Sequence, residues 1–259
     1  DIQRSRGLGD VYKRQPPDRP FIFSAHGVSK DVELHANKKN KIVINATCPL
    51  VTKVHVQAMK FFELGYRIIL IGHKNHPEVI GTMGQLPSGS IELVETVSDV
   101  MKLSINDNDN FAYLTQTTLS LDDTKKIIEA LKVRLPKIIS SPKEDICYAT
   151  SNRQKAIKEY AQMCDAFIVV GSSNSSNSNR LKELSEKCGC KSVLIDEFSD
   201  LDLDDLKNYL KISITAGASA PESKVIEIAK SIETFTDAKI IEFGEDNEDI
   251  YFKLPPELR

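Results

Sequence analysis

The 259-residue sequence lacks several features that would place it in a specialised class of protein. No apolar run approaches the roughly 20 residues that a membrane span requires. The first twenty residues are polar and carry no apolar segment of the secretory-signal type. The net charge is only -3, so no global basic field points to nucleic acid or to an anionic membrane. With 41% hydrophobic and 27% charged residues, the composition is that of a soluble globular protein with material for more than one core.

Cysteine is scarce and odd in number, with residues at Cys48, Cys147, Cys164, Cys188 and Cys190. An extracellular disulfide framework is usually denser and even in number. We therefore expect free thiols in a reducing compartment, the cytoplasm.

Residues 1–20 show neither a helical nor a strand-like period. We interpret them as a disordered arm or as sequence foreign to the fold, and we prefer the second because DIQRSRGLGDVYKRQ resembles translated cloning or adaptor sequence. The first strand that the pattern predicts lies at Phe21–Phe23.

An internal repeat of about one hundred residues organises the rest of the chain. The interval is 99 residues for three matched pairs: Cys48 and Cys147, Gly72 and Gly171, and His76 and Ser175. Each copy predicts a cysteine that opens an amphipathic helix, followed by an apolar strand that ends in a glycine and a polar loop. The expected helix faces are Val51, Val54, Ala58 and Phe61 in one copy and Ile157, Tyr160, Ala161 and Cys164 in the other.

Further strands are expected in both copies, and each last strand leads into a second polar loop. In the first full copy, strands are expected at Ile68–Ile71, near Leu93 and before the loop 114–120. In the second, they are expected at Phe167–Val170, near Leu194 and before the loop 214–222. Strands that alternate with helices predict an α/β fold with a parallel sheet in each copy. Ligands gather at the carboxyl ends of such strands, where the polar loops lie.

A third copy is only half present. The run FIFSAHGVS at 21–29 matches AYLTQTTLS at 112–120, 91 residues later. The spacing predicts that the cysteine of this copy would precede residue 1.

The polar loops carry the candidate binding residues. The loop 171–180, GSSNSSNSNR, offers hydroxyl and amide donors before a helix, which suits phosphate, although a capped and solvated loop has the same composition. The loop 72–85 holds His73, His76 and Glu78, which suit anion binding with proton transfer, a zinc site of unusual spacing, or a plain surface loop. We favour catalysis.

Several other polar residues have a structural alternative. His26 lies at the matching place of the half copy, although a lone histidine after a strand is usually structural. Thr117 and Ser219 are explained equally well as helix-capping residues, as are Thr115 and Gln116.

Cys48 and Cys147 are the most specific pair of candidate chemical residues. A thiolate at a helix N-terminus is favoured by the helix dipole, which predisposes each cysteine to act as a ligand or a nucleophile. The alternative is a buried structural thiol, which is the role we expect for the three unmatched cysteines.

The runs SAHGVS, ATCPLVTKVH, GHKNHPEVIGTMGQ, LTQTTLS, DICYATSNRQKA, VGSSNSSNSNRL and ITAGASAPE resemble the 4-hydroxy-3-methylbut-2-enyl diphosphate reductase family over residues 21–259. The resemblance implies three similar α/β domains in a pseudo-threefold arrangement around a central [4Fe–4S] cluster. It implies reduction of that substrate to isopentenyl and dimethylallyl diphosphate, the last step of the methylerythritol phosphate route to isoprenoids. Ferredoxin or flavodoxin would be the electron donor, with no nucleic-acid or membrane partner.

The resemblance also implies the roles of single residues. Cys48 and Cys147 would hold the cluster, and Glu78 would supply a proton through a network with Thr117, which also contacts the substrate. The diphosphate would be bound by the following residues: His26, His76, Ser175, Ser176, Asn177 and Ser219.

The family's first cysteine and its first diphosphate-binding histidine have no match here, so we expect this chain not to hold a complete cluster, which would compromise its own activity. The domains expected are 21–48 with 231–259 as the remnant of the first, 49–143 as the second and 144–230 as the third. A non-redox protein that binds a phosphate ligand on a repeated α/β scaffold is the alternative, and a zinc-dependent hydrolase is a further one.

Overall fold

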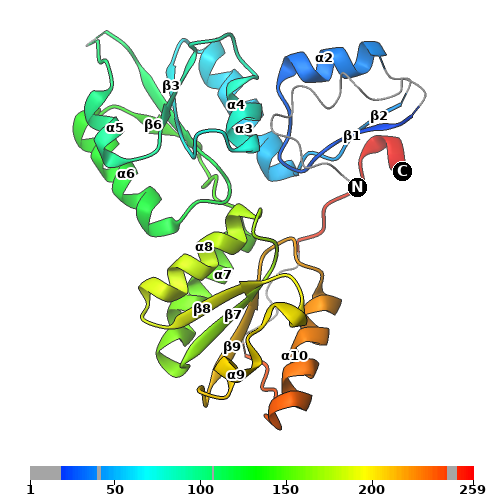
Figure 1. The fold of residues 1–259 in the computed structure, drawn as a ribbon. Coiled ribbons are helices and arrows are strands. Elements are labelled where there is room, and N and C mark those ends of the chain that lie inside the picture. The colour runs from blue at the N-terminus through cyan, green and yellow to red at the C-terminus, as the bar shows by residue number, and fades with distance from the viewer. Residues whose placement is uncertain (1–18, 40–41, 107, 244–249) are drawn as a thin grey trace. The chain divides into compact units, whose positions relative to one another are not determined.

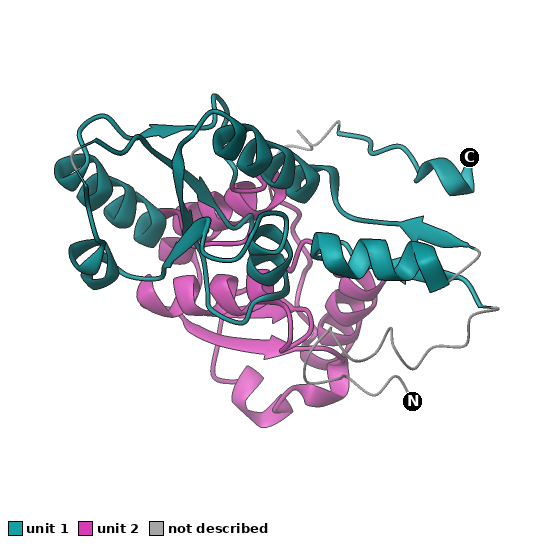
Figure 2. Ribbon diagram, turned by 90° about the horizontal axis from the view of Figure 1, so that it is seen from above, with its two compact units in different colours: residues 1–117, 122–145, 250–259 teal, residues 118–121, 146–249 magenta. Residues whose placement is uncertain are grey.

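The computed structural model describes residues 19–39, 42–106, 108–243 and 250–259. It divides into two compact units, which Figure 2 colours separately: residues 1–117, 122–145 and 250–259 form unit 1, and residues 118–121 and 146–249 form unit 2. The interpretation of residues 1–20 falls almost wholly outside the described residues and stays a prediction.

Unit 1 contains two separate parallel sheets (Figure 1). In the smaller sheet, β1 (Phe21–Phe23) pairs with β2 (Val43–Asn45), with α2 (Lys30–Lys39) between them in the chain. The larger sheet has the order β4-β3-β5-β6. Its strands are β3 (Arg67–Ile71), β4 (Ile91–Val94), β5 (Phe111–Thr115) and β6 (Ile139–Ser140).

The helices of unit 1 lie between these strands in the chain. They are α3 (Pro49–Glu63), α4 (Pro77–Met83), α5 (Val97–Lys102) and α6 (Leu121–Arg134), with a short 3-10 turn, η3 (Pro256–Leu258), near the end of the chain. One core cluster joins α3 and α4 to one face of the larger sheet. It consists of Val54, Ala58, Phe61, Ile68, Leu70, Val79, Ile91, Ala112 and Leu114.

Unit 2 repeats this plan with the sheet order β8-β7-β9. Its strands are β7 (Ala166–Val170), β8 (Lys191–Ile195) and β9 (Ile212–Ala216). Its helices are α7 (Tyr148–Tyr160), α8 (Ser176–Lys187), α9 (Leu203–Leu206) and α10 (Glu222–Thr236), with 3-10 turns η1 (Ala161–Met163) and η2 (Phe198–Asp200).

The central strand β7 shows why the sheet of unit 2 is covered on two faces. Phe167 and Val169 belong to one core cluster with residues of α7 and α8, whereas Ile168 and Val170 belong to another with residues of α9 and α10. Successive side chains of a strand point to opposite faces, so an uninterrupted apolar strand requires helices on each side. The predicted α/β fold with parallel sheets is confirmed.

The predicted repeat is confirmed in its details. In both full copies, a middle strand pairs in parallel with the strand that follows it and with the last strand. A carboxylate then receives two consecutive amide N–H groups at the next turn: Asp99 from Glu95 and Thr96, and Asp200 from Asp196 and Glu197. The predicted offset of 91 residues for the half copy is also confirmed, because α2 begins at Lys30 and α6 begins 91 residues later at Leu121.

Two predicted boundaries differ from the structure. The helix opened by Cys147 ends at Tyr160, so Ala161 lies in a 3-10 turn and Cys164 beyond it, although both still pack in the same cluster. The domain boundary at residue 230 falls inside α10, because Ile228 and Ile232 belong to one continuous buried face. Residues 231–243 therefore stay with unit 2, and only 250–259 join unit 1.

Replacing Leu70 by alanine should remove a central part of the unit 1 core, because this side chain is only 1% exposed. We expect the free energy of unfolding of unit 1 to fall by about 2–5 kcal/mol. Amide exchange of peptides from β3 and β5, followed by mass spectrometry, measures this for unit 1 separately. Val133→Ala, at a side chain that is 83% exposed, is the control and should change exchange little. Equal protection in the two variants would contradict the assignment of the core.

Candidate functional site

The clearest chemical feature of unit 1 is a buried carboxyl group. Glu78 lies in the first turn of α4, and Thr117 follows β5; each is 5% exposed. The N–H of Thr117 donates to Oε2 of Glu78 at 2.9 Å, and Oγ1 of Thr117 lies 3.0 Å and 2.9 Å from Oε1 and Oε2. The carboxyl group is therefore held in one orientation by a single residue from a neighbouring strand end.

The pKa of Glu78 is raised above its ordinary value, mainly because burial disfavours the carboxylate. The hydrogen bonds from Thr117 and the nearby His26 act in the opposite direction without reversing the shift. A glutamate of this kind keeps its proton at higher pH than a solvated one, which is the property of a general acid.

His76 is the N-cap of α4, and its Nδ1 accepts a hydrogen bond from the N–H of Glu78 at 3.2 Å. In the neutral ring the proton is then on Nε2. The pKa of His76 is lowered to about 4, first by burial and then by the charges of His26 and His73. Near neutral pH, His76 is accordingly an uncharged N–H donor.

His26 meets His76 although the two lie on separate elements. Their ring centroids are 5.8 Å apart in an edge-to-face arrangement. The loop that carries His26 is tied to the end of α4, because Nε2 of Gln85 donates to Val28 O at 2.7 Å and the N–H of Lys30 donates to Gly84 O at 3.0 Å. The structure thus brings together four predicted residues of unit 1: His26, His76, Glu78 and Thr117.

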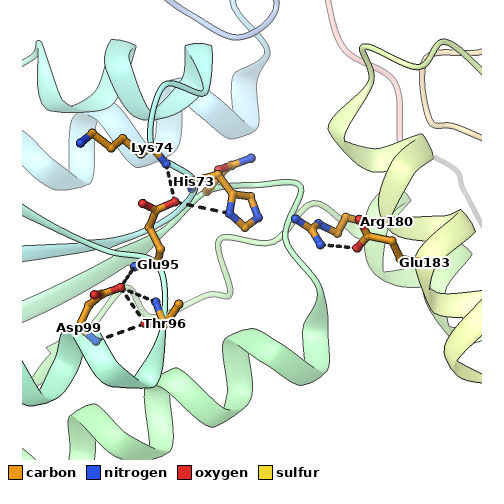
Figure 3. Close-up of polar contacts among 8 residues, drawn as sticks. His73, Lys74, Glu95, Thr96, Asp99, Arg180 and Glu183 are labelled. Atoms are coloured by element: carbon orange, nitrogen blue, oxygen red, sulfur yellow. Dashed lines mark hydrogen bonds and ion pairs between the residues drawn. The ribbon is translucent and has the colours of Figure 1, made fainter.

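His73 lies on the outer side of the same loop. Its N–H donates to Oε1 of the buried Gln116 at 3.0 Å, and its Nδ1 lies 4.0 Å from Oε2 of Glu95. Figure 3 shows Glu95 also accepting the N–H of Lys74, at 2.9 Å. Among the described residues, no group of three or more histidine, cysteine, aspartate or glutamate side chains is placed to hold a metal ion, so the zinc alternative gains no support.

The two matched cysteines occupy equivalent positions. Cys48 is the N-cap of α3 and Cys147 the N-cap of α7, and neither side chain makes a capping hydrogen bond. Both are free and partly buried. The predicted placement at helix N-termini is confirmed, and each thiol remains available for chemistry.

The Ser/Asn loop lies in unit 2 at the start of α8. Ser175 is the N-cap of this helix, and its Oγ accepts the N–H of Ser178 at 3.3 Å. Oγ1 of Thr118 lies 3.4 Å from Oγ of Ser176. His76 and Ser175 therefore cap equivalent helices, as their place in the repeat predicts.

Asn177 is 4% exposed, and neither its Oδ1 nor its Nδ2 has a hydrogen-bond partner. Leaving a buried amide unpaired costs roughly 1–3 kcal/mol, and such groups call for an explanation such as a ligand. Ser178, beside it, also has an unpaired Oγ. Ser178 is the residue that sequence reasoning missed, although it stands three positions after the predicted cap Ser175.

Glycines on either side of Ser178 explain how the loop closes so tightly. A Cβ at Gly171 would lie 2.4 Å from Oγ of Ser178, and one at Gly217 would lie 2.2 Å from it. Ser219 lies in the same turn after β9, where it is exposed. The two polar loops of unit 2 therefore converge on Ser178, as the carboxyl ends of adjacent strands predict.

No helix of the described residues is long and apolar enough to cross a membrane.

Comparison with known proteins gives a consistent result. The family model described as LytB protein matches residues 3–233, a range that includes most of the segment we set apart as foreign. The 4-hydroxy-3-methylbut-2-enyl diphosphate reductase of Methylocella silvestris is 50% identical over 93% of this chain and 76% of the relative. That of Ruegeria pomeroyi is 48% identical over 98% of this chain and 82% of the relative.

Solved structures agree with the sequence relatives. The E-1-hydroxy-2-methyl-but-2-enyl-4-diphosphate reductase of Plasmodium falciparum superposes with a TM-score of 0.89 at 42% identity, covering 96% of this chain and 77% of that one. A second structure, described as (E)-4-hydroxy-3-methyl-but-2-enyl diphosphate reductase, the terminal enzyme of the non-mevalonate pathway, gives 0.57 at 30% identity, covering 83% and 76%. The chain belongs to the LytB family, the family of the 4-hydroxy-3-methylbut-2-enyl diphosphate reductases.

Proposed function

We propose that this chain catalyses the reductive dehydroxylation of 4-hydroxy-3-methylbut-2-enyl diphosphate to isopentenyl and dimethylallyl diphosphate. The observation that carries the proposal is the buried Glu78 carboxyl group, held by Thr117 next to the His26–His76 pair. A proton donor beside histidine N–H donors suits a substrate with a leaving hydroxyl group and an anionic end. The names of the relatives support the same reaction.

The reaction replaces a carbon–oxygen bond by a carbon–hydrogen bond. It consumes two electrons and two protons, and the oxygen leaves as water. In this proposal Glu78 donates a proton to the leaving oxygen, and Thr117 keeps the carboxyl group oriented toward it. The raised pKa of Glu78 keeps the donor protonated more readily than a solvated glutamate.

On the family resemblance, we assign binding of the diphosphate end to residues of unit 1 and to residues of unit 2. In unit 1, His76 offers its Nε2–H, since Nδ1 is occupied by the N–H of Glu78. In unit 2, Asn177 has unpaired amide atoms, and Ser175 and Ser176 begin the same helix, whose N-terminus favours an anion. We assign His26 and Ser219 to the same role on the family resemblance.

The resemblance further implies an iron–sulfur cluster, and the chemistry of the two matched cysteines fits it. Iron–sulfur clusters take thiolate ligands, and thiolates are favoured at helix N-termini. The thiols of Cys48 and Cys147 lie at such termini and are not engaged as caps, so these residues would hold the cluster. When bound, such a cluster delivers electrons and offers an iron as a Lewis acid for the hydroxyl oxygen.

We propose the reducing cytoplasm, which the scarce and odd-numbered cysteines led us to expect, as the compartment of this chain. Ferredoxin or flavodoxin remains the electron donor that we propose. The expectation that this chain holds an incomplete cluster stays a prediction.

Glu78→Gln keeps the shape of the side chain and removes its acidic proton. Turnover should fall by about 10²–10⁴-fold, with the substrate measured directly under anaerobic conditions. Glu129→Gln, on the exposed face of α6, is the matched control and should leave turnover unchanged. Wild-type turnover in Glu78→Gln would refute the proposed role.

The same variant has a signature that does not need turnover. Because the pKa of Glu78 is raised in the folded state, its contribution to stability is present below the pKa of the unfolded chain and is lost as the pH rises through the folded value. Urea unfolding at several pH values should show this loss in the wild type and not in Glu78→Gln.

His76→Ala should weaken the binding of inorganic pyrophosphate about 10- to 100-fold, because hydrogen bonds to charged groups contribute roughly 1.5–3 kcal/mol. Isothermal titration calorimetry measures this directly. His35→Ala, on an exposed part of α2, is the control and should bind as the wild type does. Equal affinities for the two variants would remove His76 from the binding site.

Cys48→Ser and Cys147→Ser should each lower the iron and sulfide retained after anaerobic reconstitution, together with the visible absorbance. Cys188→Ser replaces an exposed cysteine and should retain the wild-type iron content. The iron count of the wild type itself tests whether the cluster is complete. Undiminished iron in either variant of the matched pair would contradict its assignment as a ligand.

A further inference from the structure

Lys53 makes a set of contacts that the proposed mechanism does not use. It projects from α3, the helix that Cys48 opens. Its Nζ donates to the carbonyl oxygens of Lys143 at 2.9 Å and Glu144 at 2.7 Å, and lies 3.0 Å from Oδ1 of Asp145. The Nζ group therefore donates hydrogen bonds to the two carbonyl oxygens and forms an ion pair with Oδ1 of Asp145, a buried oxygen that has no hydrogen-bond partner.

Asp145 extends this contact to the sheet. Its side chain is 4% exposed, and its second oxygen, Oδ2, accepts the N–H of Thr115 at 3.2 Å, at the end of β5. A buried carboxylate needs compensation for its lost hydration, which here comes from Lys53 on one side and a backbone amide on the other. Removing either member of a buried pair leaves the other charge uncompensated.

From Thr115 the chain of contacts leads to the proposed proton donor. The N–H of Gln116 donates to Ile71 O at 2.8 Å, and that of Thr117 donates to Glu78 Oε2 at 2.9 Å. The N–H groups of Thr115, Gln116 and Thr117 therefore donate to three separate acceptors. These are the Asp145 carboxylate, the Ile71 carbonyl oxygen and the Glu78 carboxyl group. Thr115 and Thr117 are separated by one residue, so the position of the first constrains that of the second.

We propose that Lys53 and Asp145 are positioning residues for the Glu78–Thr117 pair: the ion pair between the half-buried Lys53 and the buried Asp145 holds the end of β5 and thereby sets the hydrogen bonds of Thr117 to Glu78. This inference rests on the proposed function. The same ion pair holds the backbone two residues before Cys147, at the last residue of the segment 122–145 of unit 1. The Lys53–Asp145 pair thus positions both Glu78 and the backbone segment that leads to Cys147, the proposed cluster ligand.

The test compares Lys53→Met, Asp145→Asn and the double variant with the wild type. Each single change should lower kcat up to about 10²-fold with little change in KM, because small misplacements of reacting groups have effects of that size. Amide exchange should accelerate selectively in the peptide containing residues 115–117, and Cys147 should be alkylated faster in the cluster-free protein. The double variant should cost little more than either single one, as expected of coupled residues.

Lys60→Met, at an exposed position on the same helix, is the matched control and should behave as the wild type. Unchanged exchange at 115–117 in both single variants would overturn the inference, as would acceleration spread evenly over unit 1. The two single variants disturb the pair from opposite ends, so misfolding of one leaves the other decisive. Amide exchange and Cys147 alkylation are measured without turnover, so they test the positioning inference separately. Full activity of Glu78→Gln would refute only the proposed function.

Discussion

The buried carboxyl group of Glu78, in the first turn of α4, constrains how several elements of unit 1 are arranged. Glu78 has lost most of its hydration, and the hydrogen bonds of Thr117 are what hold it in place. Those bonds need β5 to end at a defined residue beside α4. They also need His76 to cap α4, so that the first turn presents Glu78 inward. The buried polar contacts around this group therefore link the sheet, the helix and the loop that carries His26.

The repeat explains how one backbone plan serves two kinds of chemistry. His76 and Ser175 cap equivalent helices at equivalent strand ends, and Cys48 and Cys147 occupy the N-cap positions of the preceding helices without a side-chain capping bond. The backbone hydrogen bonds of the turns before α4 and α8 are equivalent in the two copies. The side chain at the N-cap can therefore differ without changing the backbone conformation. One copy carries the buried Glu78 carboxyl group, and the other carries a loop of hydroxyl and amide donors.

Much of this organisation could be predicted from the sequence, because it depends on local periodicity. The apolar run at 167–170 and the face of Val51, Val54, Ala58 and Phe61 were readable as a buried strand and a core-facing helix. The helix ends were less accessible: α7 stops at Tyr160 because the chain turns into a 3-10 segment, although the apolar pattern continues to Cys164. The expected domain boundary at residue 230 lies within α10, whose buried face continues through Ile232.

The sequence alone specified the repeat, the parallel α/β plan and the positions of both matched cysteines at helix starts, since each follows from interactions between near neighbours in the chain. Only the folded structure shows that Thr117 binds Glu78, that His26 packs against His76 and that Lys53 pairs with Asp145. The partners in these contacts lie far apart in the chain and have no common period. Their meeting depends on how strands and helices pack, and their energetic weight depends on the burial that the packing creates.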